Sequence, residues 1–464
     1  MQTIAEKIGA YASTLKYEDL PADVIHQAKR TIMDTLACAF GGYDSEPGRI
    51  ARDVAGLVSS KQPATILCSG QKTSADLAAF ANDVMIRYLD FNDGYIAKGG
   101  GHPSDSISAL LAAAEITHRG GRDLILATVL TYEVYCCLSD AWFCKLCGID
   151  HVTHGGIGSV VGVARLLGLT QQQIVEAVNL TVAPNIALNQ TRAGNVSNWK
   201  ACAYANANRN AIFAAQLAAR GMTGPSPIFE GRNGFFKIVS RQPFELGPFG
   251  GNGQPFRIMK SHLKQFPICN GGQTVVPAAL EARGFVKDIR DIAEIHVHVS
   301  QNAWNVMADD PEKWRPRNRE TADHSIPYTA AVALMYGTID ESYFAEKYLH
   351  DKDLLELVSR IKCSVSEEAN RRVEEINLCD FDVVMRSGER KSIRVEYHRG
   401  HYLNPMTDAD IEKKVHLLVA DMLPAARIEA LIEQLWKLEA LPEVGTLIQM
   451  TESESGQPTT RKAA

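Results

Sequence analysis

The spacing of apolar residues over roughly the first 260 positions most restricts what this chain can fold into. Apolar and small side chains recur there every three or four residues, which is the period of a helix with one buried face. Helices are expected over 4–15, from Pro21, after Ser74, over 104–117, from Arg122, after Thr170 and over 197–220. Because small residues let helices pack closely, we predict a compact helical bundle.

The pattern changes after residue 223, where glycine and proline become dense, and changes again near 266. Ile292 to Val299 alternates apolar and polar residues, so a strand is predicted there. Residues 379–386 and 391–397 flank a Ser-Gly-Glu-Arg turn, which is typical of a hairpin. Residues 408–439 return to a helical pattern. The pattern alone predicts a mainly α protein with an α+β unit, and leaves open whether the last helices rejoin the first domain.

Composition and charge exclude several classes of protein. Hydrophobic residues make up 45% and charged residues 22% of the chain, which is ordinary for a globular domain. With 48 basic and 54 acidic residues the net charge is -6, so neither nucleic acid nor an anionic membrane is an expected partner. Neither a run of about 18 apolar residues nor an export signal is visible, so we expect a cytoplasmic protein.

The ten cysteines are expected to be reduced thiols in that compartment. Cys144 and Cys147, with His151 and His154 nearby, are the residue types that bind zinc. The segment 132–146 is also predicted as an apolar helix, where cysteine acts as a small hydrophobic residue. We therefore favour a packing role, with a zinc hydrolase as a distant alternative.

Four polar stretches next to helices hold the residues that can carry chemistry: 87–104, 148–155, 195–200 and 315–328. His102 and His151 are each placed at a helix start, where free N–H groups favour anions. Lys200 begins an alanine-rich helix, and a lysine is seldom buried without a partner or a purpose. No nucleotide-binding motif is present. The residue types in these stretches are instead typical of a site that binds an acidic substrate and removes a proton next to a carboxylate.

The same stretches resemble the MmgE/PrpD family. The motifs that carry the resemblance are 34–38, 90–93, 102–104, 199–210, 221–225, 319–328 and 404–408. The resemblance implies an all-helical domain formed by 1–265 with 401–464, a smaller α+β lid domain over 266–400, and a homodimer. It also implies small di- or tricarboxylate substrates and no metal or organic cofactor.

The resemblance also implies the site residues. By motif, the catalytic group is Asp90, His102, His151, Lys200 and Tyr328, and the substrate contacts are Arg87, Gly94, Gln273 and His324. Our hypothesis is that Lys200 and His102 hold carboxylates and that His151 or Asp90 moves the α-proton. Tyr328 would exchange a proton with the departing group. Arg87 and Gly94 are predicted to add positive charge and room beside Asp90.

We therefore predict a cofactor-independent lyase that acts by α-proton abstraction, most simply a dehydratase similar to 2-methylcitrate dehydratase. Decarboxylation and epimerisation of a related acid or imino-diacid start from the same carbanion, so both stay open. A non-catalytic oligomeric binding protein on the same scaffold is the alternative from another class.

Overall fold

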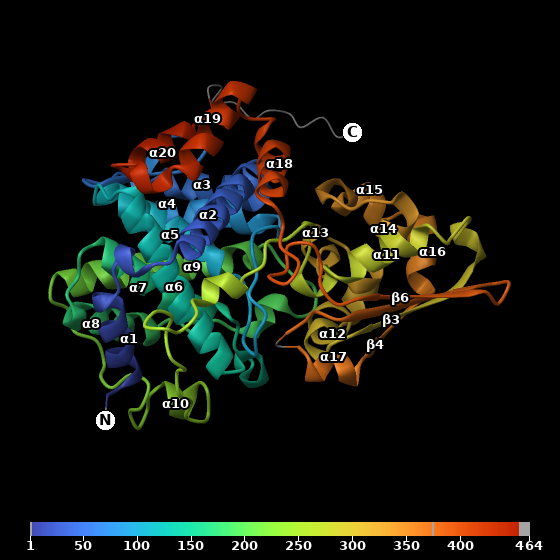
Figure 1. Cartoon of the computed structure of the whole chain (residues 1–464), viewed down its shortest axis with the longest axis horizontal. Helices are drawn as coiled ribbons and strands as arrows, with labels where there is room; N and C mark the ends of the chain where they lie inside the picture. The colour runs from blue at the N-terminus through green and yellow to red at the C-terminus, as the bar shows by residue number, and fades with distance from the viewer. Residues whose placement is uncertain (1, 374, 454–464) are drawn as a thin grey trace.

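The computed structural model describes residues 2–373 and 375–453, which form a mainly helical protein (Figure 1). The helices are α1 (Ile4–Thr14), α2 (Ala22–Gly42), α3 (Glu46–Ala55), α4 (Ala75–Tyr88), α5 (Ile107–Ile116), α6 (Gly121–Ala141), α7 (Val152–Leu166), α8 (Gln171–Val182), α9 (Trp199–Ala219), α10 (Phe235–Ile238), α11 (Val275–Arg283), α12 (Gln301–Met307), α13 (Arg319–Ala322), α14 (Ile326–Tyr336), α15 (Glu346–Leu349), α16 (Lys352–Ser359), α17 (Glu367–Arg371), α18 (Asp408–Val419), α19 (Ala425–Trp436) and α20 (Val444–Met450). The strands are β1 (Pro63–Thr65), β2 (Lys72–Ser74), β3 (Ile292–Val299), β4 (Ile361–Val365), β5 (Cys379–Met385) and β6 (Arg390–Val395).

Reciprocal caps fix where several helices begin. The Thr170 hydroxyl accepts from the N–H of Gln173, whose side chain accepts from the Thr170 N–H, and the same capping box opens α1 and α18. Ser74 precedes α4 as predicted but makes no such side-chain bond. The predicted helix over 132–146 is shorter, because α6 ends at Ala141 and Cys144–Cys147 forms a 3-10 turn.

The glycines of α7 explain why the first part of the chain is rich in small residues. A Cβ at Gly162 would lie 2.2 Å from the Thr131 hydroxyl on α6, and one at Gly155 would lie 2.4 Å from the Tyr204 ring on α9. These helices therefore approach more closely than larger side chains would allow.

The main sheet has the strand order β4-β3-β5-β6, with β3 and β4 parallel and the other pairs antiparallel. Val297 of β3 pairs with Cys363 on one side and Phe381 on the other. The alternation predicted for 292–299 is confirmed, because the isoleucines and valines of β3 are buried and its polar residues are partly exposed. The hairpin predicted near 379–397 is also confirmed as β5 and β6.

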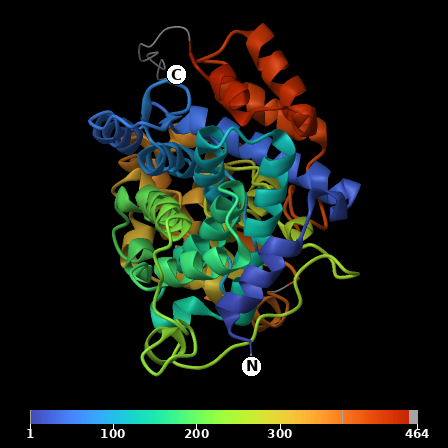
Figure 2. The ribbon, with the colours of Figure 1, turned by 90° about the vertical axis from the view of Figure 1, so that its left-hand side faces the viewer.

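Two hydrophobic cores lie on either side of the functional region. The first contains residues from Ile4 to Leu263 and continues with residues from Met406 to Ile448. The second contains residues from Phe266 to Ile393. Helices α18 and α19 pack against α2, at the top of the first core as drawn in Figures 1 and 2. The domain boundaries themselves stay a prediction, which limited proteolysis would test.

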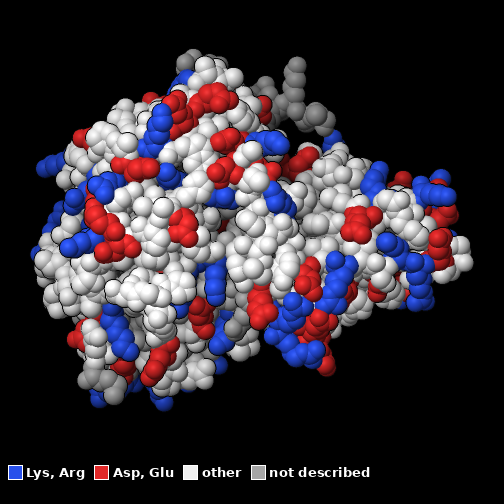
Figure 3. Space-filling model, viewed as in Figure 1, with Lys and Arg blue, Asp and Glu red and all other residues white. Residues whose placement is uncertain are grey.

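Among the described helices, α6 has the length and apolar composition of a membrane span, and 89% of its most apolar window is buried inside the protein. Such burial is typical of a core helix. On the face drawn in Figure 3, Lys and Arg are interspersed with Asp and Glu rather than gathered in one stretch.

Candidate active site

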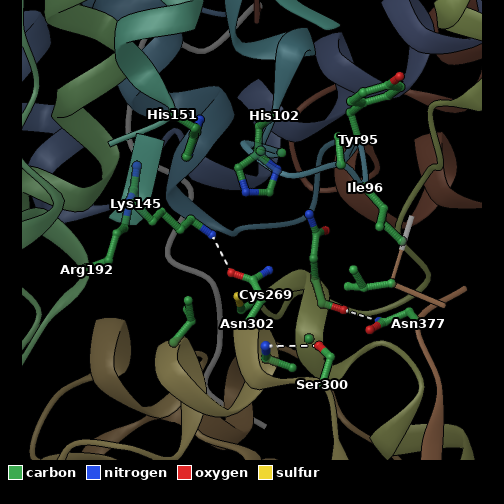
Figure 4. A pocket seen from close by; sticks show the side chains of 18 of the residues that line it. Tyr95, Ile96, His102, Lys145, His151, Arg192, Cys269, Ser300, Asn302 and Asn377 are labelled. Carbon is green, nitrogen blue, oxygen red and sulfur yellow. Dashed lines mark hydrogen bonds between the residues drawn. The ribbon is translucent and has the colours of Figure 1, made fainter. Parts of the chain in front are cut away.

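A pocket opens between the first core and the segment that carries the main sheet (Figure 4). The helical side supplies the loop around 95–102 and the turns that precede α7 and α9, and the other side supplies residues near 269–271, 300–306, 373 and 377. The charged, imidazole and thiol side chains that line it are Arg87, His102, Lys145, His151, Arg192, Cys269 and His324.

Asp90 is the centre of a buried ion network below this pocket. It follows α4 with a φ of +53°, a left-handed conformation that aspartate tolerates better than most residues. Its carboxylate lies 2.8 Å from Arg87 Nη1, 3.7 Å from Lys200 Nζ and in direct contact with Lys264 Nζ. Burial alone would raise the pKa of Asp90, but Arg87, Lys264 and Lys200 hold it well below its usual range.

A second buried carboxylate, Asp323, completes the network. Its oxygens lie 2.5 Å from Lys200 Nζ and 2.5 Å from Nδ1 of His324. Burial opposes its ionisation, but Lys200 and His324 lower the pKa of Asp323 to about 2. The other imidazole nitrogen of His324 lies 3.5 Å from Asp90, so this ring bridges the two carboxylates.

The positive charge of Arg87 is only partly neutralised by the carboxyl groups around it. It lies 3.5 Å from Asp105, but burial raises the pKa of Asp105 to about 7. Burial also raises the pKa of Asp83 well above its usual range, and the Asp105 charge adds to that effect. Around neutral pH this carboxyl pair therefore retains a proton, and part of the Arg87 charge remains available to an anion in the pocket.

His102 is a neutral imidazole with a free basic nitrogen. Nδ1 lies 2.6 Å from the Asp93 carbonyl oxygen, which can only accept, so Nδ1 carries the proton. Nε2 therefore bears the lone pair, and it lies 3.8 Å from Asp90. Burial, together with the charges of Arg87 and Lys264, lowers the pKa of His102 well below its usual range.

His151 faces the same pocket from the start of α7, as the sequence predicted for a helix N-terminus. Its ring centre lies 5.5 Å from that of His102, and Nδ1 lies 3.1 Å from the Tyr135 hydroxyl. Burial lowers the pKa of His151 well below its usual range, and Asp150, 3.4 Å from Nε2, partly opposes this. Two imidazoles thus stand side by side at the pocket wall (Figure 4).

Five of the predicted site residues do not line the pocket: Asp90 and Lys200, which belong to the buried ion network, and Tyr328, Gln273 and Gly94. The Tyr328 hydroxyl donates to the Tyr343 carbonyl at 2.6 Å. The Gln273 amide donates to the carbonyls of Phe266 and Ile268 and so shapes a loop. Gly94 leaves no free room, because a Cβ there would lie 2.4 Å from His262 and 2.6 Å from Asn270. Their predicted contacts with substrate stay predictions.

Three cations near the pocket escaped prediction from the sequence: Lys145, Arg192 and Lys264. Lys264 is fully buried, and its ammonium also donates to the Asp90 carbonyl at 2.8 Å. Lys264 lies close in sequence to the apolar residues Leu263 and Phe266, and a lysine among apolar residues indicates burial with a partner, as it does for Lys200. Arg192 stands in a turn before α9, where no local pattern indicates burial.

The residues available to a metal ion are Asp90, Asp323 and His324, the one group within ligand distance among the described residues. Arg87, Lys200 and Lys264 already contact these carboxylates, so a further cation would meet strong repulsion. Cys144, Cys147, His151 and His154 do not form such a group in the part of the chain that the structure describes.

The buried carboxyl groups predict a pH-dependent stability. The folded pKa of Asp105, about 7, is above its unfolded value, so its contribution is full at low pH and is lost as the pH rises toward 7. We expect the unfolding free energy of the wild type minus that of Asp105→Asn to fall by about 1–3 kcal/mol between pH 5 and 7.5 and then to stay constant. Denaturant titrations at several pH values would measure it.

The control for that experiment is Asp53→Asn, because Asp53 is exposed on α3. Its difference from the wild type should not change with pH. A difference for Asp105→Asn that rises with pH would contradict a protonated Asp105 in the folded protein.

The fold and the pocket define a mainly helical protein with a cationic cavity next to a neutral imidazole pair. The MmgE/PrpD N-terminal domain model matches residues 6–246, and the MmgE/PrpD C-terminal domain model matches residues 266–438. The chain belongs to the MmgE/PrpD family.

Several characterised relatives are similar along most of their length. The 2-methylcitrate dehydratase of Cupriavidus necator is 28% identical over 375 residues, covering 75% of each chain. The alkylcitrate dehydratase phiI of a fungal species is 27% identical over 431 residues, covering 84% of this chain and 82% of the relative. Human cis-aconitate decarboxylase is 26% identical over 475 residues, covering 98% and 96%. The resemblance stated from the sequence motifs is thus confirmed at the level of the family.

Proposed function

We propose that this chain is a lyase that removes water from a small hydroxy-polycarboxylate of the alkylcitrate class, without a metal or organic cofactor. The observation that carries the proposal is a neutral imidazole, His102, whose basic nitrogen faces a pocket walled by incompletely neutralised cations. Relatives named as 2-methylcitrate and alkylcitrate dehydratases support the choice of dehydration.

The charges of the pocket favour a polyanionic substrate. Arg87, Lys200 and Lys264 surround Asp90, and Lys200 is shared with Asp323. Three cations therefore face two ionised carboxylates; Lys145 adds a further positive charge, whereas Arg192 is paired with Asp150. A carboxylate that enters this dry, positively charged site gains more than it would in water.

His102 is the group that we assign as general base. Its Nε2 would remove a proton from the carbon next to a bound carboxylate, and the charge that develops on that carboxylate would be stabilised by Arg87. Without substrate, the low pKa of His102 would make this imidazole a weak base. A bound polyanion offsets the positive charges of Arg87 and Lys264, which add to burial in lowering that pKa. Substrate binding thus raises the basicity of His102 when it is needed.

The electron pair released from the carbon forms the double bond as the neighbouring hydroxyl leaves. His151, next to His102, is placed to protonate that hydroxyl so that water departs. Bound carboxylates favour the protonated form of His151 in the same way. Asp90 and Lys200 then hold the network in place, which differs from our hypothesis that Asp90 removes the proton or that Lys200 touches the substrate.

We also propose that the enzyme is a cytoplasmic homodimer. Helices α3 and α9 both expose apolar side chains: Ile50, Val54, Trp199 and Phe213. Their first turns lie side by side, since the Asn198 amide donates to Glu46 at 3.4 Å. Association of two copies through these helices would cover the exposed apolar surface, and sedimentation analysis would test it.

Proton NMR in D2O tests the reaction. We expect the EDTA-treated protein to convert a 2-alkylcitrate into an unsaturated tricarboxylate, seen as loss of the substrate signals and appearance of the product signals. The panel should include malate-like acids, cis-aconitate and an imino-diacid.

Each other outcome contradicts dehydration in a different way. Release of CO2 from cis-aconitate would indicate a decarboxylase, and solvent deuterium without net conversion would indicate an epimerase. Tight binding with neither exchange nor conversion of any acid would indicate a binding protein on this scaffold.

A further inference from the structure

Arg192 lines the pocket and has one guanidinium nitrogen without a hydrogen-bond partner among the described residues. It ends the 3-10 turn Asn189–Arg192, and its side chain is 93% buried. Nε donates to Asp150 at 3.0 Å and Nη1 donates to the Lys200 carbonyl at 3.2 Å, so the guanidinium plane is fixed. Nη2 is buried without a partner among the described residues, although the side chain lines the pocket. A buried guanidinium nitrogen without an acceptor is costly, so an acceptor is expected to enter.

Lys145 brings a second cation to the same end of the pocket (Figure 4). Its ammonium donates to the Asn302 side chain of α12 at 3.0 Å, and this bond reaches across the pocket from the helical side to the other. An ammonium has three donors. Among the described residues the Lys145 ammonium bonds this neutral amide rather than a carboxylate, so its charge is not neutralised by the bond.

Arg192 and Lys145 lie at one end of the pocket, and Asn377 lies at the opposite end (Figure 4). In Figure 4, Arg192 and Lys145 lie together on one side, His102 and His151 lie above, and Ile96 with Asn377 lies on the opposite side. A substrate with its reacting carbon next to His102 can reach Arg192 and Lys145 with one arm, because all three residues line the same pocket.

We propose that Arg192 and Lys145 form a carboxylate-binding subsite that takes a remote carboxylate of the substrate and so selects tricarboxylates over dicarboxylates. A carboxylate there would accept from Arg192 Nη2 with one oxygen and from Lys145 with the other. The inference rests on the proposed function, since it names the substrate class of the same site.

The experiment uses acids that cannot be dehydrated, so it reports binding alone. Tricarballylate carries three carboxylates and no hydroxyl, and methylsuccinate is the same acid without one terminal carboxylate. By calorimetry we expect the wild type to bind tricarballylate more tightly than methylsuccinate. Lys145→Met and Arg192→Gln should each weaken tricarballylate binding by about 10- to 100-fold and methylsuccinate binding by less than threefold.

Lys98→Met is the matched control, because Lys98 is exposed on the loop beside the pocket and should leave both affinities unchanged. Equal weakening of both acids, no weakening, or no preference of the wild type for tricarballylate would overturn the subsite. If the subsite behaves as expected but NMR shows no turnover of any hydroxy-acid, the dehydratase proposal fails and the subsite stands. Arg192→Gln also removes bonds to Asp150 and Lys200, so Lys145→Met decides if the arginine variant does not fold.

Discussion

Replacing Lys264 by methionine is expected to lower kcat/KM for the preferred acid by about 100- to 1000-fold. Lys264 lies at the centre of the site without lining the pocket: its ammonium contacts the Asp90 carboxylate and donates to the Asp90 carbonyl. Without Lys264, the Asp90 carboxylate is balanced by Arg87 and Lys200 alone, so less of their positive charge remains to bind the substrate. The loop that begins at Asp90 in a left-handed conformation also loses its anchor.

The same substitution should reduce stability, because it leaves a buried carboxylate with one cation fewer. Removing one partner of a buried ion pair costs about 3–5 kcal/mol of stability. We expect a loss at the lower end of this range, because Asp90 still contacts Arg87 and Lys200. The double variant Asp90→Asn, Lys264→Met should recover stability without recovering activity. Thermal and denaturant unfolding beside steady-state kinetics would measure both effects.

Lys260→Met is the control for Lys264→Met, since Lys260 is exposed four residues earlier. A shift in pH dependence separates an electrostatic role from a purely structural one. The charge of Lys264 lowers the pKa of His102, so its removal should move the acid limb of the kcat/KM profile to higher pH. Unchanged activity in a folded Lys264→Met protein would show that the network around Asp90 does not support the chemistry.

The helical part and the sheet could be predicted from sequence because both depend on local periodicity. The alternation over 292–299, the turn at 387–390 and the Thr170 cap each involve residues within a few positions of one another. The end of the helix after residue 132 was placed too late, because the apolar run continues through Trp142 and Phe143 while the backbone leaves the helix at Ala141. Tertiary packing of Trp142 against His154 and Phe244 decides that boundary.

The site could be predicted only where a motif marked it. His102, His151, Arg87 and His324 reach the pocket, but the partners that set their chemistry are remote in sequence. Lys264 contacts Asp90 across 174 positions, and no local pattern shows such a pairing. The direction of a side chain is equally hidden: Tyr328 lies in a motif that resembles the family, yet its hydroxyl is bound to the Tyr343 carbonyl.

Replacing His102 by glutamine is expected to lower kcat by about 1000-fold, within the range of roughly 100- to 10000-fold that a general base contributes. Glutamine has similar reach and its amide can still donate to the Asp93 carbonyl, but it has no basic nitrogen for the pocket. Tricarballylate affinity should stay within threefold, because the carboxylates bind to cations. The loss should therefore appear in kcat rather than in binding.

The pH profile and deuterium exchange identify the base. Protonation of His102 inactivates it, and its pKa lies below the ordinary value, so the wild type should lose activity only below about pH 6.5, and the residual activity of His102→Gln should lack this limb. His118→Gln is the control, because that ring is 76% exposed on the surface. If His151→Gln abolishes incorporation of solvent deuterium while His102→Gln retains it, the base is His151, and the order of the two imidazoles in the reaction is the reverse of the one proposed.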